Sequence, residues 1–332
     1  GSEGVVVGDA EVAGGHGRGV CHGRRADGPP LPSSAVHVLF ATAEMEPLVS
    51  TGGLGAASAG LVAALRRDGV RVTPVLPGYR PWELVGERVL QLTVPAWAGP
   101  AVARIGTVPG LGEVAVIDAP SLPRPHPYVD PETGSGWRDN DHRFFAWSSA
   151  VAALAMALRP DVVHVNDWHA ATTLAHLRPG PATVLSIHNL AHQGWCDEGW
   201  VGALGTRGER FRWKNSVNAL AGGIALADRV VTVSPRYAVE ITTEEGGMGL
   251  DRLLASRGND LVGILNGIDT DDWDPSSDPA LVTTFDAAHP ELKAANHDAL
   301  CDELGLAPGP GPLVVSVSRF DYQKGIDLLG EA

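Results

Sequence analysis

VHVLFATAEMEPLVSTGGLGAASAGLVAALRRDGVRVTPVLPG, residues 36–78, reads as a strand, a glycine-rich loop, a helix and a second strand. Residues 36–43 and 70–78 are apolar runs rich in β-branched side chains, which is typical of buried strands. Between them, residues 58–69 carry apolar side chains at helical spacing and end on Gly69, a residue favoured just past a helix C-terminus. Two strands joined through a helix form a βαβ unit, so this stretch predicts a parallel sheet.

The alternation of strands and helices continues to about residue 270. In one strand–helix pair, Ser234 is placed to cap a helix that begins at Pro235. The fold class is therefore α/β, with a Rossmann-like parallel sheet. The expected elements are a helix over 142–158, a strand over 161–167, a short helix from Trp168, a strand over 183–187, a helix over 216–227, a strand and helix within 229–241, and a strand and turn within 261–269.

Three regions of the chain differ in composition. Residues 1–35 are rich in glycine, proline and small residues without an apolar period, which predicts a disordered leader. Residues 36–270 form the predicted N-terminal Rossmann-like domain. Residues 271–332 start with polar turns and continue with a helix over 289–306 and a strand over 312–318. This last region predicts a linker and the beginning of a second Rossmann-like domain.

The charge and cysteine composition argue against several kinds of partner. A formal net charge of -14, from 25 Lys and Arg against 39 Asp and Glu, repels nucleic acid and anionic lipid. No apolar run approaches the roughly 18 residues of a membrane span, and residues 1–35 lack the apolar core of a secretory signal. The cytoplasm is therefore the expected location. Cys21, Cys196 and Cys301 show no CxxC spacing, so we expect neither a disulfide framework nor a zinc site.

Polar side chains gather directly after the predicted strands. In open α/β sheets, ligands bind at the carboxyl edge, where loops and helix N-termini converge. We therefore expect one end of the sheet to hold the functional site. The polar runs are AEMEPLVSTGGLG, NDWH, HN, SP, NGID and SRFDYQK.

The glycines of the first polar run allow more than one interpretation. Gly52, Gly53 and Gly55 open a helix whose free amides could bind a phosphate or another anion. An equally weighted alternative is a tight connection that needs the positive φ of glycine. A dinucleotide site fits poorly, because Ser58 replaces a third glycine and the next strand ends without an acidic residue.

Strand ends also carry side chains suited to chemistry. His188 could donate a hydrogen bond to a sugar hydroxyl or a leaving-group oxygen, although a lone histidine is more often structural. Asp167 and His169 could share the rim of one cleft, but Asp167 alone is more simply interpreted as the cap of the following helix. Arg319 and Lys324 flank a predicted turn, where two cations suit a diphosphate; two solvated surface charges are the alternative.

Taken together, these motifs resemble the ADP-glucose-dependent glycogen and starch synthases, which are retaining glycosyltransferases of the two-Rossmann GT-B architecture. The resemblance covers about residues 36–330. The matching runs, in order, are AEMEPLVSTGGLG, VVHVNDWHA, LSIHNLAHQGW, ADRVVTVSPRYAVEI, GLDRLLASRGNDLVGILNGIDTDDWDP, LKAANHDALCDELGL and SVSRFDYQKGIDLL.

The resemblance implies transfer of glucose from ADP-glucose to the non-reducing end of an α-1,4-glucan. Retention of configuration is implied, with no cofactor and no obligatory metal. Arg319 and Lys324 would bind the diphosphate and stabilise the leaving group. His188 would line the donor glucose, with Asp167 and Asn266 along the same cleft.

The resemblance also implies substrate-binding roles at the first glycine-rich turn and after His188. Gly52, Gly53 and Gly55 would place amides near the phosphates. Glu44, from the same motif, would face the acceptor, and Asn189 would contact substrate.

Two departures from the family pattern keep other functions open. Ser50 and Ala56 stand where the family usually has lysine and aspartate. Losing one cation from an anion site can cost on the order of 2–4 kcal/mol of transition-state stabilisation. The alternatives are a non-catalytic or degenerate glucan-binding fragment, and a GT-B transferase that uses another nucleotide sugar. Acceptor length and oligomeric state do not follow from the sequence.

Overall fold

The computed structural model describes residues 36–271, 273–306, 313–318 and 324–329. Within these ranges the main element is a nine-stranded sheet in the order β12-β11-β7-β6-β1-β2-β5-β4-β3. The strands from β12 to β5 pair in parallel, and β4 and β3 add to the β5 side as antiparallel strands. The predicted α/β class with a parallel sheet is confirmed.

The strands and helices have the following bounds. The sheet contains β1 His37–Ala41, β2 Arg71–Pro77, β3 Val85–Leu92, β4 Ala101–Val108, β5 Gly112–Asp118, β6 Val162–Asn166, β7 Ala182–Ile187, β11 Arg229–Thr232 and β12 Leu261–Gly263. A small antiparallel sheet contains β8 Trp195–Cys196, β9 Arg212–Trp213 and β10 Ser216–Asn218. The helices are α1 Gly53–Arg67, α2 Asn140–Leu158, α3 Asp167–Ala171, α4 Thr173–His176, α5 Trp200–Ala203, α6 Ala219–Leu226, α7 Pro235–Glu240, α8 Asp251–Ala255, α9 Lys293–Leu304 and α10 Ile326–Leu329. Short 3-10 helices span Ala96–Ala98, Gly205–Phe211, Gly258–Asp260 and Pro290–Leu292.

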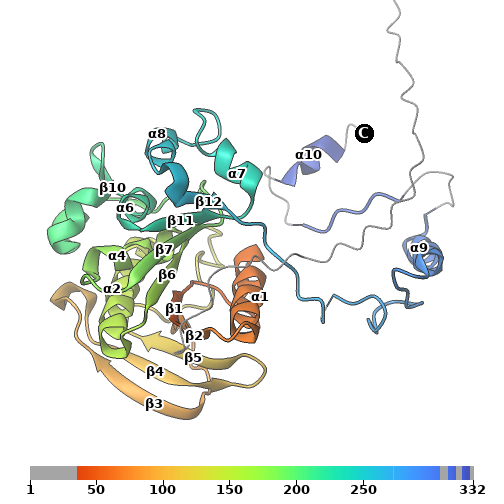
Figure 1. Cartoon of the computed structure of the whole chain (residues 1–332), viewed down its shortest axis with the longest axis horizontal. Coiled ribbons are helices and arrows are strands. Elements are labelled where there is room, and N and C mark those ends of the chain that lie inside the picture. The colour runs from red at the N-terminus through yellow and green to blue at the C-terminus, as the bar shows by residue number, and fades with distance from the viewer. Residues whose placement is uncertain (1–35, 272, 307–312, 319–323, 330–332) are drawn as a thin grey trace, which may run out of the picture. The chain divides into compact units, whose positions relative to one another are not determined.

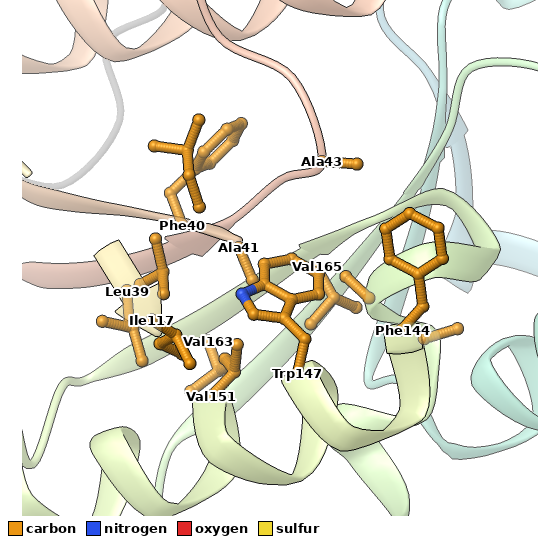
Figure 2. Packing of buried hydrophobic residues seen from close by; sticks show 14 of the residues in the cluster. Leu39, Phe40, Ala41, Ala43, Ile117, Phe144, Trp147, Val151, Val163 and Val165 are labelled. Atoms are coloured by element: carbon orange, nitrogen blue, oxygen red, sulfur yellow. The ribbon is translucent and has the colours of Figure 1, made fainter. Parts of the chain in front are cut away.

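Helices lie on both faces of the central strands, with α1 on one side and α2 with α4 on the other (Figure 1). Alternate residues of β1 point to opposite faces, as the period of a strand requires. Leu39 and Ala41 face α2, where Trp147 and Val151 pack against them, and Phe40 points the other way (Figure 2). Because both faces of the central strands are covered, these strands are largely apolar rather than strictly alternating.

Two local sequence signals are confirmed at the helix ends. Ser234 accepts a hydrogen bond from the Tyr237 amide at 3.0 Å and so caps α7, whose first residue is Pro235. Gly69 follows α1 with a φ of +83°, a conformation that L-residues with side chains rarely adopt. These caps fix where a helix begins after β11 and where the chain turns from α1 into β2.

Three expectations about the elements need correction. The helix predicted over 58–69 begins earlier, at Gly53, because the glycine-rich segment is itself helical. The antiparallel strands β3 and β4 were not predicted. The strand predicted over 312–318 is wrong for the described residues 313–318, which pair with no strand of the described chain; Val317 is 94% exposed there. A strand needs a neighbour for its backbone hydrogen bonds, and apolar sequence alone does not supply one.

The loop before α2 depends on one fully buried arginine. Arg143 is 0% exposed, and its guanidinium donates to the carbonyl oxygens of Ser121, Leu122 and Pro127. It also donates to Asn140 Oδ1 at 2.7 Å. Burial lowers the pKa of Arg143 to about 10, so the side chain stays charged at neutral pH.

We expect Arg143→Met to destabilise the protein by about 3 kcal/mol, because several buried oxygen acceptors would lose their donor. Urea unfolding monitored by fluorescence measures this change. Arg138→Met is the control, since Arg138 is exposed and should change the free energy of unfolding by less than about 0.5 kcal/mol. Equal losses in the two variants would contradict this account of the loop.

Candidate functional site at the carboxyl edge of the sheet

The end of β6 and the end of β7 place three polar side chains together. The two strands are parallel neighbours, with Asn166 in register with Ser186. Asp167 therefore follows β6 beside the point where His188 follows β7. The His188 amide donates to Asp167 Oδ1 at 2.8 Å, and His188 Nε2 lies 3.0 Å from Asn166 Oδ1. The structure thus brings together the predicted His188 and Asp167, and adds Asn166 as a partner that the sequence analysis missed.

The Asp167 carboxylate is a backbone acceptor rather than a helix cap. Its carboxylate accepts from the amides of His188 and Asn189, whereas α3 has no side-chain cap. The capping interpretation is therefore wrong, because the carboxylate is directed across to the neighbouring strand end. Asp167 is 6% exposed and has a φ of 54°, a left-handed conformation that costs a residue with a side chain. Burial raises the pKa of Asp167, and the two amide bonds only partly offset this effect.

The hydrogen bonds of Asn166 fix the tautomer of His188. Asn166 Nδ2 donates to the Ala41 carbonyl oxygen at 3.0 Å, so Oδ1 is the amide atom that faces the imidazole. An amide oxygen only accepts, so His188 Nε2 must carry a proton. In the neutral ring, Nδ1 is then the nitrogen with a free lone pair. The neutral His188 ring is thereby prepared to accept a hydrogen bond from a ligand hydroxyl rather than to donate one, as the sequence analysis expected, because Asn166 already takes its Nε2 proton.

The glycine-rich turn is held by a buried glutamate. Glu44 is 4% exposed, and its Oε2 accepts from the amides of Thr51, at 2.5 Å, and Gly52, at 3.0 Å. Its Oε1 accepts from the Tyr128 hydroxyl at 2.6 Å. Glu44 therefore supports the turn through both of its oxygens, and its expected role toward the acceptor stays a prediction.

The three predicted glycines of this turn do not adopt positive φ. Gly52 is extended, with a φ of −155°, and Gly53 and Gly55 belong to the first turn of α1. The tight-turn alternative is therefore wrong. Gly55 is needed for a different reason, because a Cβ atom there would lie 2.9 Å from Ser50 Oγ. The amides of Gly53 and Leu54, in the first helical turn, have no intrahelical acceptor and remain suited to an anion.

Ser50, where the resembled family usually has lysine, is a neutral hydroxyl bound to a carboxylate. Ser50 Oγ donates to Glu46 Oε1 at 2.8 Å, at an exposed position of the turn. This pair places a carboxylate, rather than a cation, beside the start of α1. An anion approaching the turn would therefore meet repulsion from Glu46 in addition to the attraction of the helix amides.

A pocket of about 460 Å³ lies on the sheet face between α1 and residues 264–269. His188 and Asn266 both line it, so the structure brings these two predicted residues to one cavity. Its floor includes His164, whose Nε2 lies 2.7 Å from Ser186 Oγ. Burial lowers the pKa of His164 to about 3, so this ring is neutral at physiological pH. The rest of the lining is largely apolar, from β1, β6, β7, β11 and α1.

The remaining predicted residues lie apart from this cluster or outside the described chain. His169 is 8% exposed and packs among the rings of Tyr128, Phe144 and Trp168, and burial lowers its pKa to about 3. It is therefore a buried aromatic neighbour rather than part of an open rim. Lys324 is exposed, and Arg319 lies outside the described residues, so their predicted pairing is untested.

The described residues show neither a metal-binding cluster nor a membrane-spanning helix. Residues 36–271, 273–306, 313–318 and 324–329 contain no group of three or more His, Cys, Asp or Glu side chains placed to hold a metal ion. No helix in the same ranges is both long and apolar enough to cross a bilayer.

The fold and the polar edge place the chain among the ligand-binding open α/β proteins. Open α/β proteins bind ligands with a Rossmann-like sheet that carries hydrogen-bonded polar side chains at the carboxyl ends of adjacent strands. His188, Asn266 and the start of α1 all belong to this edge or to the pocket beside it.

The sequence profile of the starch synthase catalytic domain matches residues 37–256, and the chain belongs to this family. It is 41% identical over 315 residues to a glycogen synthase of Methylocella silvestris, covering 89% of this chain and 65% of that protein. It is 43% identical over 317 residues to a glycogen synthase of Rhodopseudomonas palustris, covering 89% of this chain and 64% of that protein. The chain thus spans less than two thirds of the length of these relatives.

A solved structure supports the same assignment. The catalytic domain of starch synthase IV from Arabidopsis thaliana, bound to ADP and acarbose, superposes with a TM-score of 0.75 at 31% identity. The match covers 90% of this chain and 65% of the Arabidopsis chain. The predicted resemblance and the GT-B fold class are therefore confirmed.

The raised pKa of Asp167 predicts how a variant should respond to pH. Because the folded-state pKa lies above the usual value of 3.8, the ionised carboxylate costs stability once pH exceeds that value, and the cost disappears below it. Asp167→Asn removes the charge. We expect the free energy of unfolding of the variant, relative to the parent, to improve as pH rises from 3 to 7. Urea titrations at several pH values measure this difference, and a difference that moves the opposite way would contradict the burial of an ionised Asp167.

Proposed function

We propose that this chain forms the acceptor-side part of a glucosyltransferase that moves glucose from ADP-glucose to the non-reducing end of an α-1,4-glucan. The observation that carries the proposal is the oriented His188, whose ring nitrogen Nδ1 is left as an acceptor beside a pocket that Asn266 also lines. Membership of the starch synthase family supports the reaction class. The ADP bound to the Arabidopsis relative supports the choice of nucleotide.

In the proposed reaction, His188 and Asn266 hold the donor sugar by its hydroxyl groups. His188 Nδ1 accepts one hydroxyl proton in a hydrogen bond, and Asp167 keeps the imidazole in place through the backbone. Fixing the sugar in one orientation lowers the entropy cost of reaching the transition state. Asn189 follows His188 in the same loop, and its contact with substrate is part of the proposal.

Charge on the leaving diphosphate would be balanced by cations and amide dipoles. Arg319 and Lys324 are the proposed cations, and the first-turn amides of Gly53 and Leu54 the proposed dipoles. Such groups can stabilise a leaving diphosphate without a metal, so we propose a metal-independent and cofactor-independent transfer with retention. The cytoplasm remains the predicted location.

The experiment that tests this function measures ADP release from ADP-glucose with glycogen as acceptor. It compares this chain with a chimera continued by the C-terminal third of the Methylocella silvestris glycogen synthase. We expect glycogen-dependent ADP release from the chimera, and a drop in kcat of about 10²-fold in its His188→Ala variant. His297→Ala is the control, because His297 is exposed on α9. UDP-glucose in the same assay tests for another nucleotide sugar.

The Ser50–Glu46 pair favours a second candidate, a glucan-binding fragment without transfer activity. A carboxylate in place of a lysine weakens the attraction for a diphosphate without affecting a neutral oligosaccharide. Binding of maltoheptaose by the chimera, with no ADP release from either protein, would support this candidate over the enzyme.

The same pair predicts a gain of function. Ser50→Lys would restore a cation beside the start of α1, so we expect the Kd for ADP to fall by up to about tenfold, or 1.4 kcal/mol. Isothermal titration calorimetry measures the change. Ser50→Met is the matched control, because it adds length without charge and also removes the bond to Glu46. Equal affinities in the two variants would show that no phosphate lies near position 50.

A further inference from the structure

The loop that follows β7 has its successive backbone amides bound by three different acceptors. The amides of His188 and Asn189 donate to Asp167, and the Ala191 amide donates to Asn189 Oδ1 at 3.0 Å. The amide between them, that of Leu190, donates to the Tyr237 hydroxyl oxygen at 3.1 Å. Leu190 is 1% exposed, so its amide would be left without water if this acceptor were removed.

Tyr237 reaches the loop from a separate strand end. It lies on α7, which begins directly after β11, and β11 is the parallel neighbour of β7, with Thr232 in register with Ile187. Ser234 caps α7, and Pro235 at the first position of the helix independently fixes where the helix begins. Two neighbouring strand ends thus hold the same loop, β6 through Asp167 and β11 through Tyr237.

We propose that Tyr237 is a positioning residue for His188, acting through its hydrogen bond to the Leu190 amide. Asp167 fixes the loop at the amides of residues 188 and 189, and Tyr237 fixes the next one. With all three held, the loop has little freedom to rotate the imidazole away from Asn166. The part of this inference that concerns transfer rests on the proposed function.

The chemistry of the phenol suits this role at all physiological pH values. Burial raises the pKa of Tyr237; the Leu190 amide bond offsets part of this rise, and the charge of Asp167 adds a smaller upward effect. The hydroxyl therefore stays protonated and neutral, and its oxygen can still accept from an amide. The aromatic ring packs against the main core, so a test must remove the hydroxyl and keep the ring.

The test compares Tyr237→Phe with Ser234→Ala. The first variant removes only the hydroxyl, and the second loosens the cap of the same helix without touching the bond to Leu190. Amide hydrogen exchange, followed by NMR in this chain, is the first measurement. In Tyr237→Phe we expect the exchange rate of the Leu190 amide, relative to the rates of the β7 amides, to rise roughly three- to tenfold. In Ser234→Ala we expect this relative rate to stay at the value of the parent protein.

Transfer kinetics in the chimera are the second measurement. We expect Tyr237→Phe to lower kcat about three- to tenfold with little change in KM for ADP-glucose, because the donor still binds but His188 is less often in place. Ser234→Ala should leave kcat near the parent value. Unchanged exchange at Leu190, or the same response in both variants, would overturn the positioning role. An unchanged kcat beside faster exchange would overturn it as well.

A failure of the proposed function is separable from a failure of this inference. If the parent chimera releases no ADP, the exchange experiment still decides whether Tyr237 holds the loop. Faster exchange at Leu190 in Tyr237→Phe alone then supports the positioning role, and unchanged exchange overturns it.

Discussion

The buried carboxylate of Asp167 is the interaction on which the edge of the sheet depends. It bridges the ends of β6 and β7 by accepting the His188 and Asn189 amides, in a backbone conformation that is unfavourable for a residue with a side chain. Strain and burial both cost free energy, so the surrounding structure must hold the group in place. In return, the two amide bonds to Asp167 fix the direction of the chain after β7. The position of the His188 imidazole, and the hydrogen bond that its Nε2 donates to Asn166, follow from that direction.

A second buried carboxylate also accepts backbone amides, at the end of the neighbouring strand β1. Glu44, which follows β1, accepts the amides of Thr51 and Gly52 and the hydroxyl of Tyr128. Each carboxylate thus acts as an internal anion that satisfies backbone donors at a turn. The two carboxylates leave different groups available to a ligand. At His188 the arrangement leaves a ring nitrogen free, whereas at the glycine-rich turn it consumes two amides that a phosphate could otherwise use.

The parallel sheet and its polar edge could be predicted from the sequence, because apolar runs and helical periods are local signals. His188 and Asp167 were singled out because each follows a strand directly, whereas Asn266, which lies beyond the end of β12, came from the family resemblance. Partners that are distant along the chain were not found: Asn166 is 22 residues from the His188 that it contacts, and Tyr128 is 84 residues from Glu44. The prediction that Asp167 caps the following helix failed for the same reason. An aspartate at this position has the same local sequence whether it caps the helix or bonds to the neighbouring strand end. The missed antiparallel strands, and the described residues 313–318 that pair with no described strand, both show that pairing is decided by neighbours rather than by composition.

The most direct test of this account is the protonation state of the His188 ring, read from its two-bond ¹H–¹⁵N correlations by NMR at neutral pH. The hydrogen bonds of Asn166 predict one tautomer for the neutral ring, with the proton on Nε2 and the lone pair on Nδ1. Asn166→Leu should remove the acceptor and let the two tautomers mix. A ring protonated on Nδ1 in the parent protein, or a tautomer that ignores the loss of Asn166, would contradict the claim that the strand ends prepare His188 to receive a sugar hydroxyl.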